Sequence, residues 1–211
     1  MTEQLLGRMF ASLIWIMTIS LLLVKAHRSA QASYRLQAVG EAGLLAVLAL
    51  NNEPWLWLDV GLVLAIKEIV IPRILSSHGE VASKDYGAKS AVGMAFLLMV
   101  AAIVTAAGLA LGEVPGLDRP LMSGILIGAW FISFIHLSAR YETWSLSWAL
   151  LSLDTVSGVL AVSVAGPLPE FAGVGMELAA LAIAVLLAWL SRKIFTLLHT
   201  TDVRDVEELT G

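Results

Sequence analysis

Apolar residues occupy seven long stretches of the chain, separated by short segments that are polar or rich in proline and glycine. A helix needs about 20 predominantly apolar residues to cross the hydrocarbon core of a bilayer. The stretches cover residues 4–24, 34–51, 55–75, 90–111, 120–139, 144–165 and 170–191. Their lengths predict an all-α integral membrane protein with about seven transmembrane helices.

The segments between the stretches carry turn signals. Asn51–Pro54 predicts a tight turn between the second and third helices, and Gly112–Gly116 opens the connection between the fourth and fifth. Gly166–Pro169 turns the sixth helix into the seventh, because proline and glycine stop one helix and start the next. The chain therefore divides into a three-helix segment with a cytoplasmic linker, a fourth helix with its loop, and a three-helix segment with a short tail: residues 1–89, 90–119 and 120–211.

Composition agrees with a membrane protein and excludes several kinds of chemistry. The chain is 58% hydrophobic and 14% charged, whereas soluble domains are about one-quarter charged. It has no cysteine, which excludes disulfides, iron–sulfur ligation and thiolate zinc sites within it. The four histidines lack metal-ligand spacing, and no phosphate loop or nucleophile motif appears. We expect no catalytic, cofactor-binding or metal-binding residue and no nucleic-acid partner; the lipid bilayer is the expected surrounding.

Lysine and arginine placement predicts the orientation. With seven spans, one side of the membrane receives ten of these residues and the other receives only Arg8 and Arg119. The ten are Lys25, Arg28, Arg35, Arg73, Lys84, Lys89, Arg140, Arg192, Lys193 and Arg204. Because positively charged loops remain in the cytoplasm, we expect an external N-terminus, retained as a helix, and a cytoplasmic C-terminus.

Tryptophans lie near the ends of the expected helices, where such residues commonly anchor a protein at the membrane interface. They are Trp55, Trp57, Trp144, Trp148 and Trp189. We interpret all of them as interfacial anchors. Small residues such as Thr105–Gly108 permit close packing between helices and require no further function.

Two carboxylates, Asp154 and Glu177, lie inside the sixth and seventh expected helices. Asp154 precedes the turn at Pro167 by thirteen residues and Glu177 follows it by ten, so their depths differ by about 4–5 Å. Two carboxylates in a low-dielectric region favour proton binding, because both cannot easily be ionised together. In the alternative interpretation, one acid is hydrogen-bonded to a serine or threonine and the other faces a partner subunit.

Further charged residues lie in the third helix, at Lys67 and Glu68. Adjacent helical residues point about 100° apart, so we expect each side chain to meet a group on a different helix. Pro72 leaves the carbonyl of Glu68 without its helical hydrogen bond and can bend or hydrate the helix. A relay role for Lys67 and a structural role, in which it neutralises a buried acid, both remain open.

Glu41 and His136 are the remaining polar candidates. Glu41 lies about one-third of the way into the second helix from the cytoplasmic side, and His136 lies near the cytoplasmic end of the fifth. A proton path from the cytoplasm could use either residue, although His136 also fits an interfacial histidine without a role. Asp59 and Arg73 lie close enough to helix ends to reach the interface, and we assign them no function.

Short motifs give the chain a resemblance to a known family. Tyr34-Arg35-Leu36-Gln37 opens the second helix, Pro72 follows Lys67 by five residues, and Arg192-Lys193-Ile194 precedes a tail that ends Glu208-Leu209-Thr210-Gly211. With its length and seven-helix plan, the whole chain resembles component E of hydrogenase-4. This component is a membrane subunit of formate-hydrogenlyase-type complexes, which contain group 4 nickel–iron hydrogenases.

The last three helices resemble subunit K of respiratory complex I, which carries two membrane glutamates implicated in proton transfer. The resemblance places Asp154 and Glu177 at these positions, with an aspartate replacing the first glutamate and shortening the side chain by one methylene. Lys67 matches a lysine of the hydrogenase subunit. Glu68 and Glu41 have no such counterpart, so their candidacy depends on burial alone.

The resemblance implies a non-catalytic subunit of an oxidoreductase complex in a bacterial or archaeal cytoplasmic membrane. Its partners would be anchor and antiporter-like subunits of a complex-I-like membrane arm, together with peripheral hydrogenase and iron–sulfur subunits that perform the redox chemistry. The expected contribution to proton translocation comes from Lys67, Asp154 and Glu177, with Glu68, Glu41 and His136 as further candidates. Two alternatives remain: an accessory subunit of a multisubunit cation/proton antiporter, and a purely structural membrane scaffold.

Overall fold

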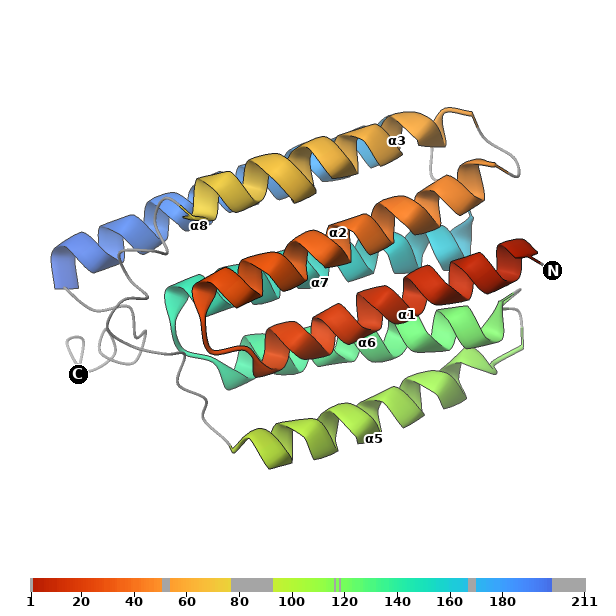
Figure 1. The fold of residues 1–211 in the computed structure, drawn as a ribbon, viewed down its shortest axis with the longest axis horizontal. Coiled ribbons are helices and arrows are strands. Elements are labelled where there is room, and N and C mark those ends of the chain that lie inside the picture. The colour runs from red at the N-terminus through yellow and green to blue at the C-terminus, as the bar shows by residue number, and fades with distance from the viewer. Residues whose placement is uncertain are drawn as a thin grey trace.

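The described residues of the computed structural model form a bundle of helices that run in alternating directions along one long axis, which is horizontal in Figure 1. The model describes residues 2–50, 54–76, 93–115, 117, 119–166 and 170–198. The helices are α1 (Thr2–Leu23), α2 (His27–Ala49), α3 (Leu56–Val63), the π-helix η1 (Leu64–Val70), α5 (Met94–Gly112), α6 (Pro120–Ala139), α7 (Thr143–Ala165) and α8 (Glu170–Leu198). The all-α class predicted from the apolar stretches is confirmed for this part of the chain.

Five helices of the described part are long and apolar enough to cross a membrane. They comprise Glu3–Leu23, Met94–Gly112, Pro120–Ala139, Thr143–Ala165 and Ala172–Leu197. The other two expected spans correspond to α2 and to the continuous segment α3–η1, which lie along the same axis (Figure 1). α2 carries Gln37 and Glu41, which lower its apolar character. The third expected span is divided between α3, with 8 residues, and η1, with 7 residues, and each is too short to cross a membrane by itself. Seven spans and their orientation therefore stay predictions.

Several helix boundaries differ from those expected. α2 begins at His27 rather than at residue 34, and α8 continues to Leu198 rather than ending at 191. The extension of α2 is a polar segment with ordinary helix propensity, and that of α8 begins with the charged pair Arg192-Lys193, where the apolar pattern stops although the helix continues. The expected turn residues 51–53, most of the linker and the tail after residue 198 lie outside the described residues.

Glycines bring α5 and α6 into close contact. Gly108 and Gly112 of α5 lie against Gly124 and Gly128 of α6, and a side chain at Gly108 or Gly112 would collide with the backbone of α6. Without a hydrophobic driving force between helices in lipid, such close backbone approach is a main source of helix association. Of the small residues at 105–108, Thr105 and Gly108 therefore have the packing role that the sequence predicted, whereas Ala106 and Ala107 are exposed.

Two of the expected interfacial tryptophans are buried inside the bundle. Trp144 is 5% exposed and Trp148 is fully buried. Trp148 donates a hydrogen bond to Nδ1 of His27 at 3.3 Å, and its ring packs on Tyr34 with a centroid distance of 5.1 Å. The prediction was wrong for this pair because α7 is enclosed by α2, α6 and α8 at this end. Trp189, by contrast, is 56% exposed, as an anchor in lipid would be.

The third helix is interrupted by a π-helical turn. The π-helix η1 covers Leu64–Val70, and the N–H of Ile71 donates to the carbonyl of Ile66, five residues earlier. Pro72 explains this geometry: its ring has no N–H and would crowd the carbonyl of Glu68 in a regular α-helix. The widened turn gives that carbonyl room, and Lys67 lies in it with its side chain buried in the bundle.

Candidate functional site

Lys67 lies at the centre of a buried cluster of carboxylates. Its side chain is 1% exposed, and its Nζ lies 2.9 Å from Oε1 of Glu41 and 3.1 Å from Oε1 of Glu177. Oδ2 of Asp154 is 3.5 Å away. The four residues come from η1, α2, α8 and α7, so the cluster connects four elements. We call Lys67, Glu41, Asp154 and Glu177 the Lys67 cluster.

The structure brings together residues that the sequence indicated separately. Asp154 and Glu177, placed at similar depth by counting residues, both contact one ammonium group. Lys67 meets groups on other helices, as the angle between adjacent residues required. Glu41, a candidate only because of its burial, is the nearest partner of Lys67 and accepts from Nζ with both oxygens.

The charges of the Lys67 cluster do not balance. One ammonium faces three carboxylates, so the fully ionised cluster would carry a formal charge of −2. Taking charges out of water costs several kcal/mol or more per uncompensated group. The three N–H bonds of the ammonium can serve three acceptors, but its charge neutralises only one. The remaining negative charge therefore requires protons or other cations.

Glu68 does not belong to the Lys67 cluster. It lies on the neighbouring face of η1 and forms an ion pair with Arg35 of α2. Their side chains are 21% and 49% exposed, respectively. The structure thus separates Lys67 from Glu68: the first residue faces the interior, and the second faces the outside of the bundle.

His136 is also buried, at 1% exposure, but it lies away from the Lys67 cluster. Its Nε2 is 3.3 Å from the hydroxyl of Ser145. Ser133, one turn earlier on α6, lies 3.2 Å from the hydroxyl of Ser152 on α7. Ser152 in turn accepts a hydrogen bond of 2.9 Å from Nε2 of Gln37. This chain of polar groups runs from the vicinity of His136 toward the Lys67 cluster.

Gln37 was missed in the sequence, although a signal was present. It precedes Glu41 by four residues and therefore lies on the same face of α2, one turn away. Its side chain is fully buried, and it also donates to Oγ1 of Thr18 at 3.0 Å. A buried glutamine one turn from a buried glutamate indicates a polar face rather than an isolated acid.

Asp59 is the second residue whose position differs from expectation. We expected it to reach the membrane interface, but its side chain is buried, with 5% exposure. It lines a cavity of about 20 Å³ together with Glu41 and Glu177. The absence of a side chain at Gly173 leaves room for its carboxylate, and this contact between α3 and α8 could not be derived from spacing along either helix.

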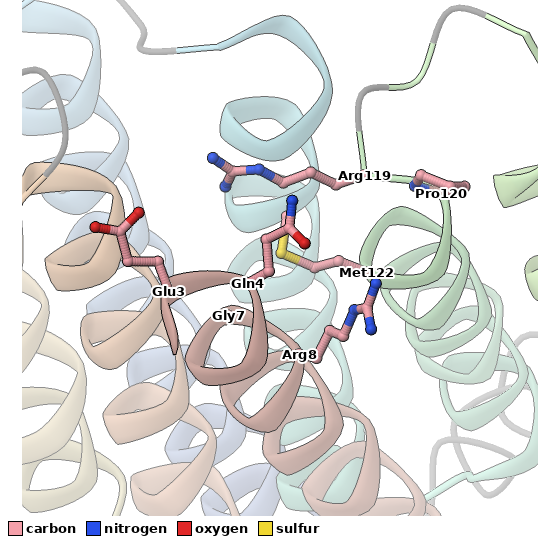
Figure 2. Close-up of a pocket in the computed structure, with 7 residues that line it drawn as sticks. All are labelled: Glu3, Gln4, Gly7, Arg8, Arg119, Pro120 and Met122. Atoms are coloured by element: carbon pink, nitrogen blue, oxygen red, sulfur yellow. The ribbon is translucent and has the colours of Figure 1, made fainter. Parts of the chain in front are cut away.

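A larger cavity of about 50 Å³ lies at the end of the bundle where α1 and α6 begin (Figure 2). Its charged lining residues are Glu3, Arg8 and Arg119. The two guanidinium groups point in different directions: that of Arg119 extends toward the side of the view on which Glu3 lies, and that of Arg8 points away from Glu3 (Figure 2). The charges do not converge on a common point here, so we place the candidate site at the Lys67 cluster.

Comparison of the chain with protein-family models, with curated proteins and with solved structures finds no match.

Proposed function

We propose that the chain is an integral membrane subunit of a complex-I-like membrane arm, of the group 4 hydrogenase or formate-hydrogenlyase type. In this proposal the Lys67 cluster takes part in proton translocation. The observation that carries the proposal is the excess of carboxylates around a single buried ammonium. A purely stabilising ion pair needs one acid, whereas three acids from three helices can exchange protons around a fixed positive charge.

The mechanism follows from competition for the ammonium. When Glu177 or Asp154 binds a proton, its attraction to Lys67 weakens and the remaining carboxylates hold the ammonium more tightly. When the proton leaves, the balance reverses. Asp154 is 25% exposed and is the member through which a proton would pass to a neighbouring group. The hydrogen-bonded side chains of Gln37, Ser152 and Ser133 extend the proton route toward His136.

The position of Arg35 and Glu68 supports a partner subunit. Glu68 lies twelve residues after Leu56, where α3 begins, which corresponds to about 18 Å along the helix. An ion pair exposed at this depth is costly against hydrocarbon. A polar surface of an anchor or antiporter-like subunit would remove this cost. Peripheral hydrogenase and iron–sulfur subunits would then belong to the same complex and carry its redox centres.

The proposal includes seven spans with the C-terminus in the cytoplasm of a bacterium or archaeon. α2 is 23 residues long, which gives about 34 Å and suffices to cross a bilayer. Its buried polar groups are covered by other helices, so they need not contact lipid. The cytoplasmic end would be the one where α1, α6 and α8 end, which carries Lys25, Arg140, Arg192 and Lys193.

The test is the double substitution Asp154→Asn with Glu177→Gln in the intact complex. We expect ion translocation to be lost while the subunit still assembles, because both replacements keep the side-chain size. Glu113→Gln is the control, because Glu113 is exposed just after α5, outside the Lys67 cluster and the Arg35–Glu68 ion pair, and it should retain translocation. Undiminished translocation in an assembled double variant would contradict the relay.

A scaffold role is favoured by one specific observation: the Lys67 cluster ties together α2, η1, α7 and α8. In that case replacing one charged residue of the cluster by a neutral residue would reduce the amount of assembled complex or leave the complex unchanged. It would not abolish ion translocation in a complex that still assembles. An accessory antiporter subunit would use the same cluster. The subunits that copurify with the chain distinguish the antiporter from the hydrogenase-type arm. Hydrogenase subunits should copurify with a subunit of the hydrogenase-type arm and should be absent from the antiporter.

A further inference from the structure

Asp59 is a buried acid that the Lys67 cluster does not include. It lies in the first turns of α3, and its side chain is 5% exposed. Within the part of the chain that the structure describes, its Oδ1 has no hydrogen-bond partner. An unsatisfied carboxylate oxygen in the interior costs free energy unless a proton or water meets it.

The cavity beside Asp59 is large enough for water. Its volume of about 20 Å³ exceeds the roughly 10–15 Å³ that one water molecule requires. Asp59, Glu41 and Glu177 line it. Oε2 of Glu177 also has no hydrogen-bond partner among the described residues. A water in this space would therefore have several acceptors available.

The charges facing Asp59 are negative. Glu41 comes from α2 and Glu177 from α8, while the described lining of the cavity contains no lysine or arginine. Lys67 lies on the far side of these two glutamates and is already shared with them. Asp59 also acts electrostatically on Glu177. Ionising Asp59 would therefore add a further negative charge to an unbalanced set, which favours its sharing a proton.

The cavity extends along α3 from its first turn toward the Lys67 cluster. Trp55 and Leu56 line the end where α3 begins, and Glu177 lines the inner side. Asp59 precedes Lys67 by eight residues, or about 12 Å along the helix. The polar chain toward His136 leaves the cluster in the other direction. Asp59 therefore lies on the opposite side of the Lys67 cluster from the polar groups that lead toward His136.

We propose that Asp59 and water in this cavity form a proton-access site for the Lys67 cluster. A hydrated proton transfers to the carboxylate of Asp59 and leaves a neutral water. The same proton then passes through the cavity water to Glu177 or Glu41, and Asp59 returns to its ionised form. The step needs no other reactant. It rests on the proposed function, because it supplies protons to the same cluster.

Gly173 makes the site testable without removing the acid. A methyl group at position 173 would collide with the carboxylate of Asp59, whereas one at Gly175, on the same helix, would meet nothing within 4 Å. We expect Asp59→Asn and Gly173→Ala each to lower ion translocation by the intact complex by at least about tenfold, because a positioned proton-transfer group typically contributes about 10²–10⁴-fold to a rate. Gly175→Ala is the matched control and should leave translocation unchanged.

These variants separate the two proposals. Normal translocation with Asp59→Asn, together with loss in the Asp154→Asn/Glu177→Gln variant, overturns the access site and leaves the relay intact. Normal translocation in the double variant overturns the relay itself. Loss with Gly175→Ala as well as with Gly173→Ala would assign the effect to helix packing and would also overturn the access site.

Water access can be measured without translocation, because the chain has no cysteine of its own. Met176 lines the cavity, and Ala180, one turn further along α8, is fully buried. In the intact complex we expect Met176→Cys to react with 2-aminoethyl methanethiosulfonate about tenfold faster than Ala180→Cys, since protected sites react only through rare opening. Equal rates at the two positions would show that the cavity is closed to water and would overturn the proposal.

Discussion

The choice of lysine at position 67 follows from the arrangement of its partners. A lysine ammonium is a compact charge with three donors that can point in different directions, whereas arginine presents a planar fork suited to one carboxylate. At position 67 the acceptors come from three different helices. A compact charge at their centre can remain in contact with all of them as protons are exchanged.

Removing this charge should destabilise the protein. We expect Lys67→Met to lower stability by about 3–5 kcal/mol, because it leaves buried carboxylates without their cation. Thermal unfolding of the detergent-solubilised protein measures the change. Lys193→Met is the control, since Lys193 is exposed near the end of α8, and should unfold like the parent. A Lys67→Met protein with the parent's unfolding temperature would show that the cluster contributes little to stability.

Sequence reasoning found the charges of the site more readily than their surroundings. Counting residues from Pro167 placed Asp154 and Glu177 at similar depth, because a hairpin of two helices has few degrees of freedom. Asp59 was missed because its position near a helix end equally allows an outward side chain. Its inward position depends on the missing side chain at Gly173, and that contact is a property of helix packing rather than of local sequence.

At the scale of the element, Pro72 predicted a disturbance in the third helix but not its form. A proline in a helix can produce a kink or a π-helical turn, and both relieve the same clash. The π-helix Leu64–Val70 rotates the following residues relative to a regular helix. This rotation affects which face of the helix meets the bundle, so it bears directly on where Lys67 points.

Replacing this proline should therefore affect function more than stability. Pro72→Ala allows a regular α-helix from residue 64 onward, and we expect stability to be retained while Lys67 shifts in register and ion translocation falls. Pro120→Ala is the control: Pro120 is the first residue of α6, where the missing N–H is not needed. Parent-like translocation in Pro72→Ala would mean that the π-helical turn does not position Lys67.

The contact between α5 and α6 gives a second prediction for an element. Gly108→Leu places a large side chain against the α6 backbone, and overpacking of this kind costs about 1–3 kcal/mol. We expect a lower unfolding temperature in detergent and faster proteolysis near α5. Ala107→Leu is the control, because Ala107 is exposed on the same helix. Equal behaviour of the two variants would contradict the glycine-mediated contact.

For the whole molecule, the apolar pattern predicted helices but could not predict how many of them cross the membrane. The five strongly apolar helices are recognised by composition. α2 carries Gln37 and Glu41, which weaken its apolar pattern, whereas Asp154 and Glu177 lie in helices that stay strongly apolar. The third expected span is divided between the short elements α3 and η1. Which helices are neighbours, and hence which charges meet, depends on packing between segments distant in sequence.

The seven-span arrangement predicts on which side each turn of the bundle lies. Lys25 follows α1, and Leu50 directly follows the last residue of α2. If α2 crosses the membrane, Lys25→Cys should react with a membrane-impermeant maleimide only from the cytoplasmic side of the membrane, and Leu50→Cys only from the opposite side. The cysteine-free chain makes each label specific. Reaction of both from one side would mean that α2 does not span. The Lys67 cluster would then lie between spanning and non-spanning helices, and a path across the bilayer through it would be excluded.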